Sequence, residues 1–149
     1  IPGSIGGDGR ALSSVAMDLS ADDRIALHEL AARYGNAIDE RDWDRFDTVF
    51  TEDCRYELAN FGRLDKVVHG RAAVRQMMEE SQDHPIAHHV TSVEVLVDGD
   101  QVRLRSKILG PAANGFLGSG DYVDVVVRTE HGWRIADRLV TLRKPPRAQ

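Results

Sequence analysis

The stretch that decides the fold is "VEVLVDGDQVRLRSKIL", Val93 to Leu109, which contains two runs of alternating apolar and polar residues. The runs meet at Asp98-Gly99, a dipeptide suited to the positive dihedral angles of a tight hairpin turn. A long Gly-rich loop, "GPAANGFLGSGD", then leads to "YVDVVVRT", and "EHG" turns that run into "WRIADRLVTL". The pattern predicts four antiparallel strands in the second half of the chain.

Helical spacing dominates the first half. Ser20 followed by Asp23 is typical of a capped helix start. Apolar residues then recur at helical intervals, which predicts a helix from about Ala21 to Arg41 with one buried stripe: Leu27, Leu30, Ala31, Tyr34 and Ile38. Asp42 is a candidate cap for a second helix, ending near Glu52, whose inward face is Trp43, Phe46, Val49 and Phe50.

The middle of the chain offers weaker patterns. "RYELA", Arg55 to Ala59, is a short strand candidate, and "NFGRLDK" reads as a loop. Gly70 introduces a third helix with Val74, Met77 and Met78 on one face. Helices followed by a meandering sheet predict an α+β fold with the helices on one face. A long sheet of this kind curls, so we expect it to enclose a pocket.

Composition limits the function classes. The 149 residues suit one domain, and a net charge of -5 argues against a nucleic-acid surface. No apolar run approaches the roughly 20 residues of a membrane span. A single cysteine, Cys54, excludes an intrachain disulfide and makes the cytoplasm the expected location. We expect residues 1–16 to be an added leader or a flexible tail, and residues 17–149 to form the domain.

Four segments together resemble a known family: "RYGNAIDERDWDRFDTVFTEDCRYE", "HGRAAV", "HHVTSVEVLVDGDQVRLRS" and "GDYVDVVVRTEHGWRIADR". They resemble the SnoaL-like branch of the nuclear transport factor 2-like superfamily, which includes proteins similar to scytalone dehydratase, bile-acid 7α-dehydratase and polyketide cyclases, and more distantly ketosteroid isomerase. The resemblance extends from Leu19 to Arg143. It implies a cone of curved antiparallel sheet closed by three helices, with the active site inside the cone, no cofactor, and usually a homodimer built on the outer sheet face.

The resemblance also implies site residues. Asp39 and His88 match an aspartate and a histidine of the dehydratases. Tyr34 matches a tyrosine of the bile-acid enzyme and the oxyanion-hole tyrosine of ketosteroid isomerase, and Tyr122 matches a tyrosine that points into the cone. We therefore expect Tyr122, Ser92, Leu58 and Met77 to contact substrate. Three positions depart from the pattern: Leu58 replaces both a base and a tyrosine of relatives, Ala112 falls near a second histidine, and Ser92 stands where many relatives have Asn.

Strand alternation disagrees with the resemblance about the histidine. It groups His89 with Thr91, Val93, Val95 and Val97, a clean apolar set, and leaves His88 on the other face. The resemblance favours His88 as the pocket residue, and a β-bulge would change which residues share a face. His84 also lies nearby, but these histidines are expected on extended chain without a second ligand cluster, so no metal site is predicted.

Two functions remain open from the sequence. The first is acid-base catalysis of dehydration, cyclisation or isomerisation on a small, largely apolar carbonyl compound, such as a steroid or aromatic polyketide. In it, His88 moves the proton, Asp39 supports the imidazolium, and Tyr34 or Tyr122 hydrogen-bonds the developing enolate. The alternative is a non-catalytic subunit of the same fold that binds a small ligand or serves in an assembly.

Overall fold

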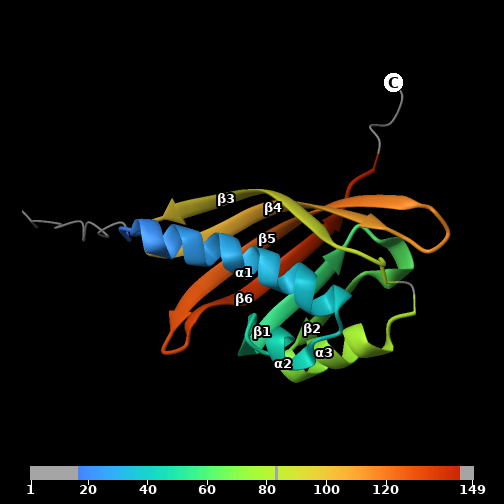
Figure 1. Ribbon diagram of the computed structural model, residues 1–149, viewed down its shortest axis with the longest axis horizontal. Coiled ribbons are helices and arrows are strands. Elements are labelled where there is room, and N and C mark those ends of the chain that lie inside the picture. Colours follow the sequence, from blue (N-terminus) through green and yellow to red (C-terminus); the bar gives the residue numbers. More distant parts are fainter. Residues whose placement is uncertain (1–16, 83, 145–149) are drawn as a thin grey trace, which may run out of the picture.

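Helix α1 (Ala21–Asp39) follows from its capping box and apolar stripe. The computed structural model describes residues 17–82 and 84–144, so the expectation for residues 1–16 lies outside the described residues. The Ser20 hydroxyl accepts from the Asp23 backbone N–H, while the Asp23 carboxylate accepts from the Ser20 N–H. The predicted stripe is buried, and the helix ends close to the expected residue. Figure 1 shows α1 running across the sheet.

The predicted second helix is partly wrong. Asp42 caps α2 as expected, but α2 (Trp43–Phe46) stops well before Glu52 because the chain turns and enters strand β1 (Phe50–Ala59). Val49 already accepts a hydrogen bond from the Ile135 N–H of another strand. Phe46, Val49 and Phe50 are all fully buried. The spacing of these apolar residues therefore indicates that they are buried, but it does not distinguish the buried face of a helix from the buried start of a strand.

The segment after β1 contains more structure than the predicted loop. A short 3-10 helix, η1 (Gly62–Leu64), leads to the edge strand β2 (Lys66–His69), which pairs antiparallel with β1. Helix α3 (Arg71–Glu80) then begins after Gly70, as predicted. The strand β2 is short and largely exposed, so its sequence carries no alternating signal.

The four predicted strands are confirmed as β3 (His89–Asp98), β4 (Gln101–Pro111), β5 (Leu117–Thr129) and β6 (Gly132–Leu142). They are successively antiparallel, and the β3–β4 hairpin turns at Gly99, whose φ is +62°. The six-stranded sheet has the order β2-β1-β6-β5-β4-β3, with β1 parallel to β6. The predicted Gly-rich loop is shorter than expected, because β4 and β5 both extend into it.

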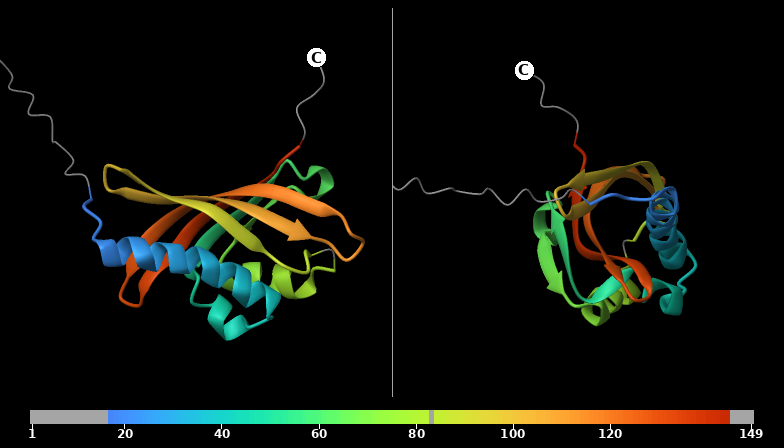
Figure 2. Two further views of the ribbon diagram at one scale, coloured as in Figure 1. Left: turned by 45° about the horizontal axis from the view of Figure 1, so that its top comes forward. Right: turned by 90° about the vertical axis from the view of Figure 1, so that its left-hand side faces the viewer.

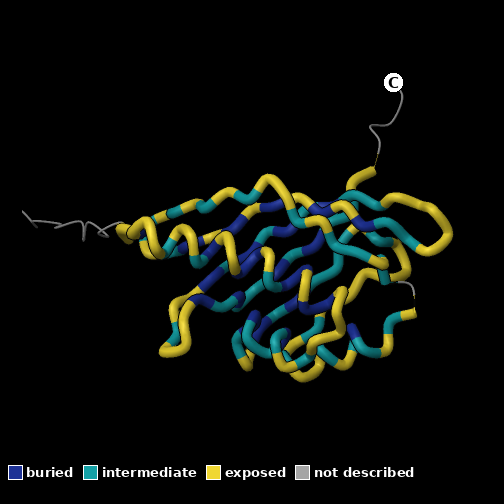
Figure 3. Tube along the Cα trace, in the orientation of Figure 1, coloured by how far each residue is buried: buried dark blue, intermediate teal, exposed yellow. Residues whose placement is uncertain are grey.

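The sheet curls without closing, and this confirms the predicted α+β cone (Figure 2). Helix α1 contacts β3, β4 and β6, and α3 contacts β1 and β2. Buried residues alternate with less buried ones along the central strands of the sheet (Figure 3). In the part of the chain that the structure describes, the buried polar residues are Ser106, Asp124 and Arg138. Within residues 17–82 and 84–144, no helix has the length and apolar character needed to cross a membrane.

Candidate active site

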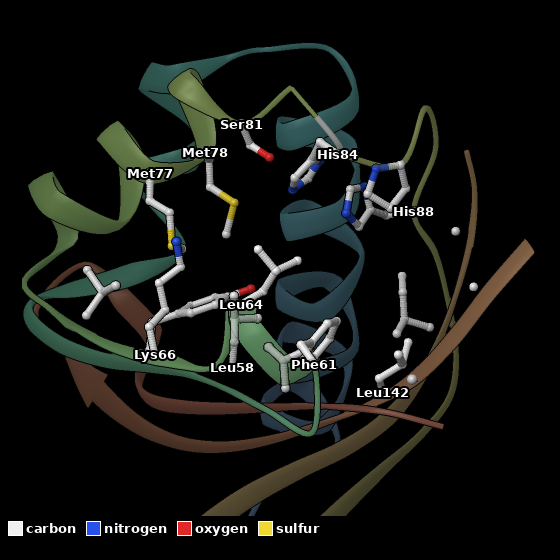
Figure 4. A pocket seen from close by; sticks show the side chains of 18 of the residues that line it. Leu58, Phe61, Leu64, Lys66, Met77, Met78, Ser81, His84, His88 and Leu142 are labelled. Carbon is white, nitrogen blue, oxygen red and sulfur yellow. The ribbon is translucent and has the colours of Figure 1, made fainter. Parts of the chain in front are cut away.

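A cavity of about 700 Å³ occupies the inside of the cone. Its lining comes from the concave face of the sheet, from α1 and α3, and from the loop before β3. Most of the lining is apolar, including Leu58, Phe61, Val68, Met77, Ile108 and Val140. Figure 4 shows the two histidines of the lining together on one side, with Met77 and Met78 on another wall. Two expected substrate contacts, Leu58 and Met77, thus line the cavity.

Asp39 and His88 form a hydrogen-bonded pair at this wall. The Asp39 carboxylate contacts His88 Nδ1 at 2.6 Å and accepts from the His88 backbone N–H at 2.8 Å. The His88 side chain is only 4% exposed and lines the cavity, whereas that of Asp39 is 23% exposed. Asp39 therefore binds the His88 ring at Nδ1 and does not itself line the cavity.

The geometry fixes the protonation of the His88 ring. A carboxylate only accepts hydrogen bonds, so the Nδ1 that meets it carries a hydrogen. Burial lowers the pKa of His88 below its ordinary value, and this effect outweighs the opposite influence of Asp39. The neutral ring then has its lone pair on Nε2, which is the nitrogen available to act as a base toward a molecule in the cavity.

Helix α1 comes close to His88 because Gly35 lies at the contact. A Cβ on Gly35 would stand 3.1 Å from the His88 carbonyl oxygen and 3.4 Å from its Cβ. Such a contact is tighter than ordinary van der Waals packing, so a larger residue here would push the helix and the strand apart. Gly35 therefore helps set the distance that lets Asp39 reach His88.

A β-bulge decides which histidine enters the cavity. The pairing of β3 with β4 shifts between Thr91 and Glu94, and Ser92 has a φ of +51°. Beyond the bulge the half-buried side of β3 is Val93, Val95 and Val97, but before it the half-buried residue is Val90. His89 is consequently exposed and absent from the cavity lining, while His88 lies inside.

The same bulge removes Ser92 from the site. Ser92 is exposed, and its hydroxyl lies 3.2 Å from that of Thr91. It does not line the cavity but borders a smaller polar hollow with Glu94, Arg105 and Lys107. The structure therefore does not bring Ser92 to the other candidate residues, because the residue that makes the bulge points away from the concave face.

Three tyrosines line the cavity beside the histidines. Tyr34 and Tyr122 were expected there, and Tyr56 of β1 was missed. The hydroxyls of Tyr34 and Tyr56 lie 3.2 Å apart, and the Tyr34 ring meets those of Tyr122 and His88 edge-on, with centroids 5.6 and 6.0 Å apart. Burial raises the pKa of Tyr56 and of Tyr122, so both phenols keep their protons and can donate hydrogen bonds. Tyr56 is two residues before Leu58 in β1, so the two side chains lie on the same face of the strand. This spacing could have predicted Tyr56 as a cavity residue.

A buried ion pair lies behind two of these rings. Arg138 of β6 donates to both Asp124 oxygens at 2.7 Å, and both side chains are 1% exposed. The guanidinium lies 4.0 Å from the Tyr34 ring centroid and 4.1 Å from that of Tyr122. Burial disfavours the Arg138 cation, but Asp124 outweighs it and raises the pKa. Sequence reasoning missed this pair, although strand alternation puts Asp124 on the inward face with Tyr122.

A second histidine was also missed as a site residue. His84, in the segment between α3 and β3, lines the cavity with its ring centroid 4.7 Å from that of His88. Burial and the neighbouring His88 lower its pKa to about 4. Ala112, by contrast, lies in the β4–β5 turn and does not line the cavity. In the described part of the chain, no three or more His, Cys, Asp or Glu residues are grouped to hold a metal ion.

Comparisons with known proteins agree with this fold. The family described as "SnoaL-like domain" matches residues 20–139. The uncharacterized protein Rv2910c of Mycobacterium tuberculosis is 32% identical over 143 residues, which cover 89% of this chain and 91% of that protein. An NTF2-like protein with a cystatin-like fold from Novosphingobium aromaticivorans superposes with a TM-score of 0.70 at 26% identity, covering 85% of each chain.

A third comparison shows the fold alone. The hexachlorocyclohexane dehydrochlorinase LinA-type3 from Novosphingobium barchaimii superposes with a TM-score of 0.67 at 16% identity, covering 84% of this chain and 92% of that one. The concave site and the family match define the class: the chain belongs to the SnoaL-like family, as the sequence resemblance predicted.

Proposed function

We propose that this protein is a cofactor-independent acid-base enzyme that removes a carbon-bound proton next to a carbonyl group. The observation that carries the proposal is the Asp39–His88 pair at the wall of a mainly apolar cavity. The buried His88 ring is hydrogen-bonded to the partly exposed Asp39, and histidines with a perturbed pKa that line a cavity are frequent in catalytic sites. Dehydration, cyclisation and isomerisation all begin with this proton transfer.

The residues divide the chemistry between them. His88 Nε2 takes the proton, and Asp39 stabilises the imidazolium that forms. The Tyr122 hydroxyl, or the hydrogen-bonded pair of Tyr34 and Tyr56, donates to the enolate oxygen. The Arg138 guanidinium behind the Tyr34 and Tyr122 rings adds positive potential on the side where negative charge develops.

The cavity supports a small, apolar substrate. A volume of about 700 Å³ lies in the usual range for ligand sites of drug-sized molecules and suits a steroid or an aromatic polyketide. A structural neighbour that shares the fold is named as a dehydrochlorinase. We therefore favour elimination, including dehydration, among the reactions that start with loss of a proton.

The test is proton exchange catalysed by the wild-type protein and two histidine variants. β-Tetralone has acidic protons beside its carbonyl and is smaller than the drug-sized molecules that a cavity of about 700 Å³ usually holds. NMR in D₂O follows the replacement of these protons by deuterium. Loss of a positioned general base lowers such a rate by about 10²- to 10⁴-fold, which we expect for His88→Ala. His89→Ala is the matched control, because His89 is the adjacent residue and is exposed, and its rate should equal that of the wild type.

Equal exchange by His88→Ala and wild type would remove His88 as the base. A wild-type protein that is stabilised against heat by β-tetralone but exchanges no protons would instead support the alternative, a non-catalytic ligand-binding member of the family.

A further inference from the structure

The second histidine of the cavity, His84, precedes a segment that is anchored to the sheet. Its loop is fixed to strand β4: a Cβ on Gly110 would lie 2.8 Å from Pro85 Cγ, so the proline ring packs directly on the β4 backbone. The next residue, Ile86, donates its N–H to the Pro111 carbonyl at 2.9 Å. The backbone that carries His84 is thus tied to the sheet directly after it, and the ring packs against that of His88.

The two imidazoles stand at one place in the cavity. Their centroids are 4.7 Å apart with the planes inclined by 41°, and both rings line the cavity on the same side (Figure 4). At this separation a single oxygen atom of a bound molecule can contact a nitrogen of each ring, since a hydrogen bond spans about 3 Å. The pair therefore offers a base and a second polar group to adjacent atoms of one substrate.

We propose that His84 is a further catalytic residue, which donates a hydrogen bond to the leaving oxygen of a β-oxygenated ketone while His88 removes the neighbouring proton. This inference rests on the proposed function and narrows the substrate to ketones with an oxygen leaving group at the β-carbon.

The step conserves atoms and charge. His88 Nε2 takes the proton from the α-carbon, and the electron pair of that C–H bond forms the enolate. The enolate pair then makes the C=C bond as the β C–O bond breaks, and the leaving oxygen takes the proton from His88. His84 holds that oxygen with its N–H and remains neutral, which its burial beside His88 favours. The products are an enone and an alcohol or water.

A series of β-aryloxypropiophenones tests this role, because the phenol that leaves can be varied from para-nitrophenol to para-methoxyphenol. A hydrogen bond to the leaving oxygen matters most for the least acidic phenol. His84→Phe keeps an aromatic ring without an N–H, and we expect it to slow release of para-methoxyphenol by about 100-fold. Release of para-nitrophenol should slow far less, so the plot of log rate against phenol pKa steepens.

Two variants separate catalysis from packing. His84→Gln retains an N–H donor and should recover part of the lost rate with para-methoxyphenol. His89→Phe makes the same change at an exposed histidine outside the cavity lining and should leave the plot unchanged. If His84→Phe does not fold, His84→Leu compared with His84→Gln makes the same distinction.

The outcomes distinguish this inference from the proposed function. Parallel plots for wild type and His84→Phe, with rates lowered equally for every phenol, would overturn the role of His84 but leave the base assignment intact. Absence of β-tetralone exchange in the wild-type protein would overturn both. A steeper plot for His84→Phe, partly reversed in His84→Gln, is the result we expect.

Discussion

Replacing Asp39 by Asn tests the tautomer that the proposed chemistry requires. The carboxylate accepts two hydrogen bonds from His88, one from Nδ1 and one from the backbone N–H. An asparagine side chain has one acceptor oxygen and one donor NH₂ group. The His88 backbone N–H can only donate, so it bonds to the Asn oxygen, and the Asn NH₂ group then faces His88 Nδ1.

This arrangement favours the other tautomer of the His88 ring. Nδ1 must then accept a hydrogen bond, so the ring hydrogen moves to Nε2 and the cavity loses its lone pair. In serine proteases a histidine base in the wrong tautomer lowers turnover by about 10⁴-fold, and we expect a fall of about 10³- to 10⁴-fold in proton exchange here. The effect on folding should be modest, about 1–3 kcal/mol, because the side chain keeps its shape and one hydrogen bond.

The assay is β-tetralone exchange in D₂O, together with nitrogen NMR of the histidine side chains to identify which ring nitrogen carries the hydrogen. Asp42→Asn is the matched control: Asp42 is exposed, caps α2 through the Arg45 N–H, and asparagine caps equally well. Exchange by Asp39→Asn close to the wild-type rate, or a hydrogen retained on His88 Nδ1 in a variant that has lost exchange, would refute this reasoning.

Four further predictions concern pH, stability and assembly. Because burial lowers the pKa of His88 from 6.5, the exchange rate should rise with pH to a midpoint below 6.5 and stay level above it. The folded pKa of His84, about 4, lies below its ordinary 6.5, so its contribution to stability is present above pH 6.5 and is lost as pH falls toward 4; urea unfolding should show this slope, and His84→Phe should reduce it. Arg138→Met leaves a buried carboxylate without its partner and should lower the free energy of unfolding by about 3–5 kcal/mol in urea titrations. Arg143→Met, in a pair 49% exposed on the arginine side, should cost less than about 1 kcal/mol. We also expect a homodimer on the outer sheet face, so Val125→Lys on that face should reduce the mass measured by sedimentation.

The sequence predicts the elements where periodicity is long. Helix α1 and the four later strands follow from it, but the boundary of α2 does not. Phe46, Val49 and Phe50 fit helical spacing, yet Phe46 ends α2, Val49 lies in the turn that follows and Phe50 begins β1. A glycine can also make a strand look like a loop. Gly110 suggested a loop, yet it lies in β4, where the Pro85 ring leaves no room for a Cβ. The contact that requires a glycine there is made by a residue distant in sequence, so the local pattern does not indicate it.

The site was less predictable than the fold. The expectation of a contact between Asp39 and His88 came from family resemblance, and alternation alone favoured His89. The bulge that reverses this choice is centred on Ser92, which has a positive φ. A glycine at this position would have indicated a positive φ from the sequence, but a serine does not. His84 reaches the cavity through a loop whose course depends on the sheet, so no local pattern could place it there.

The end of α1 explains why the Asp39–His88 pair suits proton transfer. A helix C-terminus carries partial negative charge, and Asp39, the last residue of α1, accepts both His88 hydrogen bonds there. The same negative charge stabilises a cation nearby. In the resting state burial keeps His88 neutral, so this stabilisation becomes effective only when the ring accepts a proton. The C-terminal end of α1 and Asp39 therefore favour the protonated state reached during the reaction over the resting state, and this difference is what lowers a barrier.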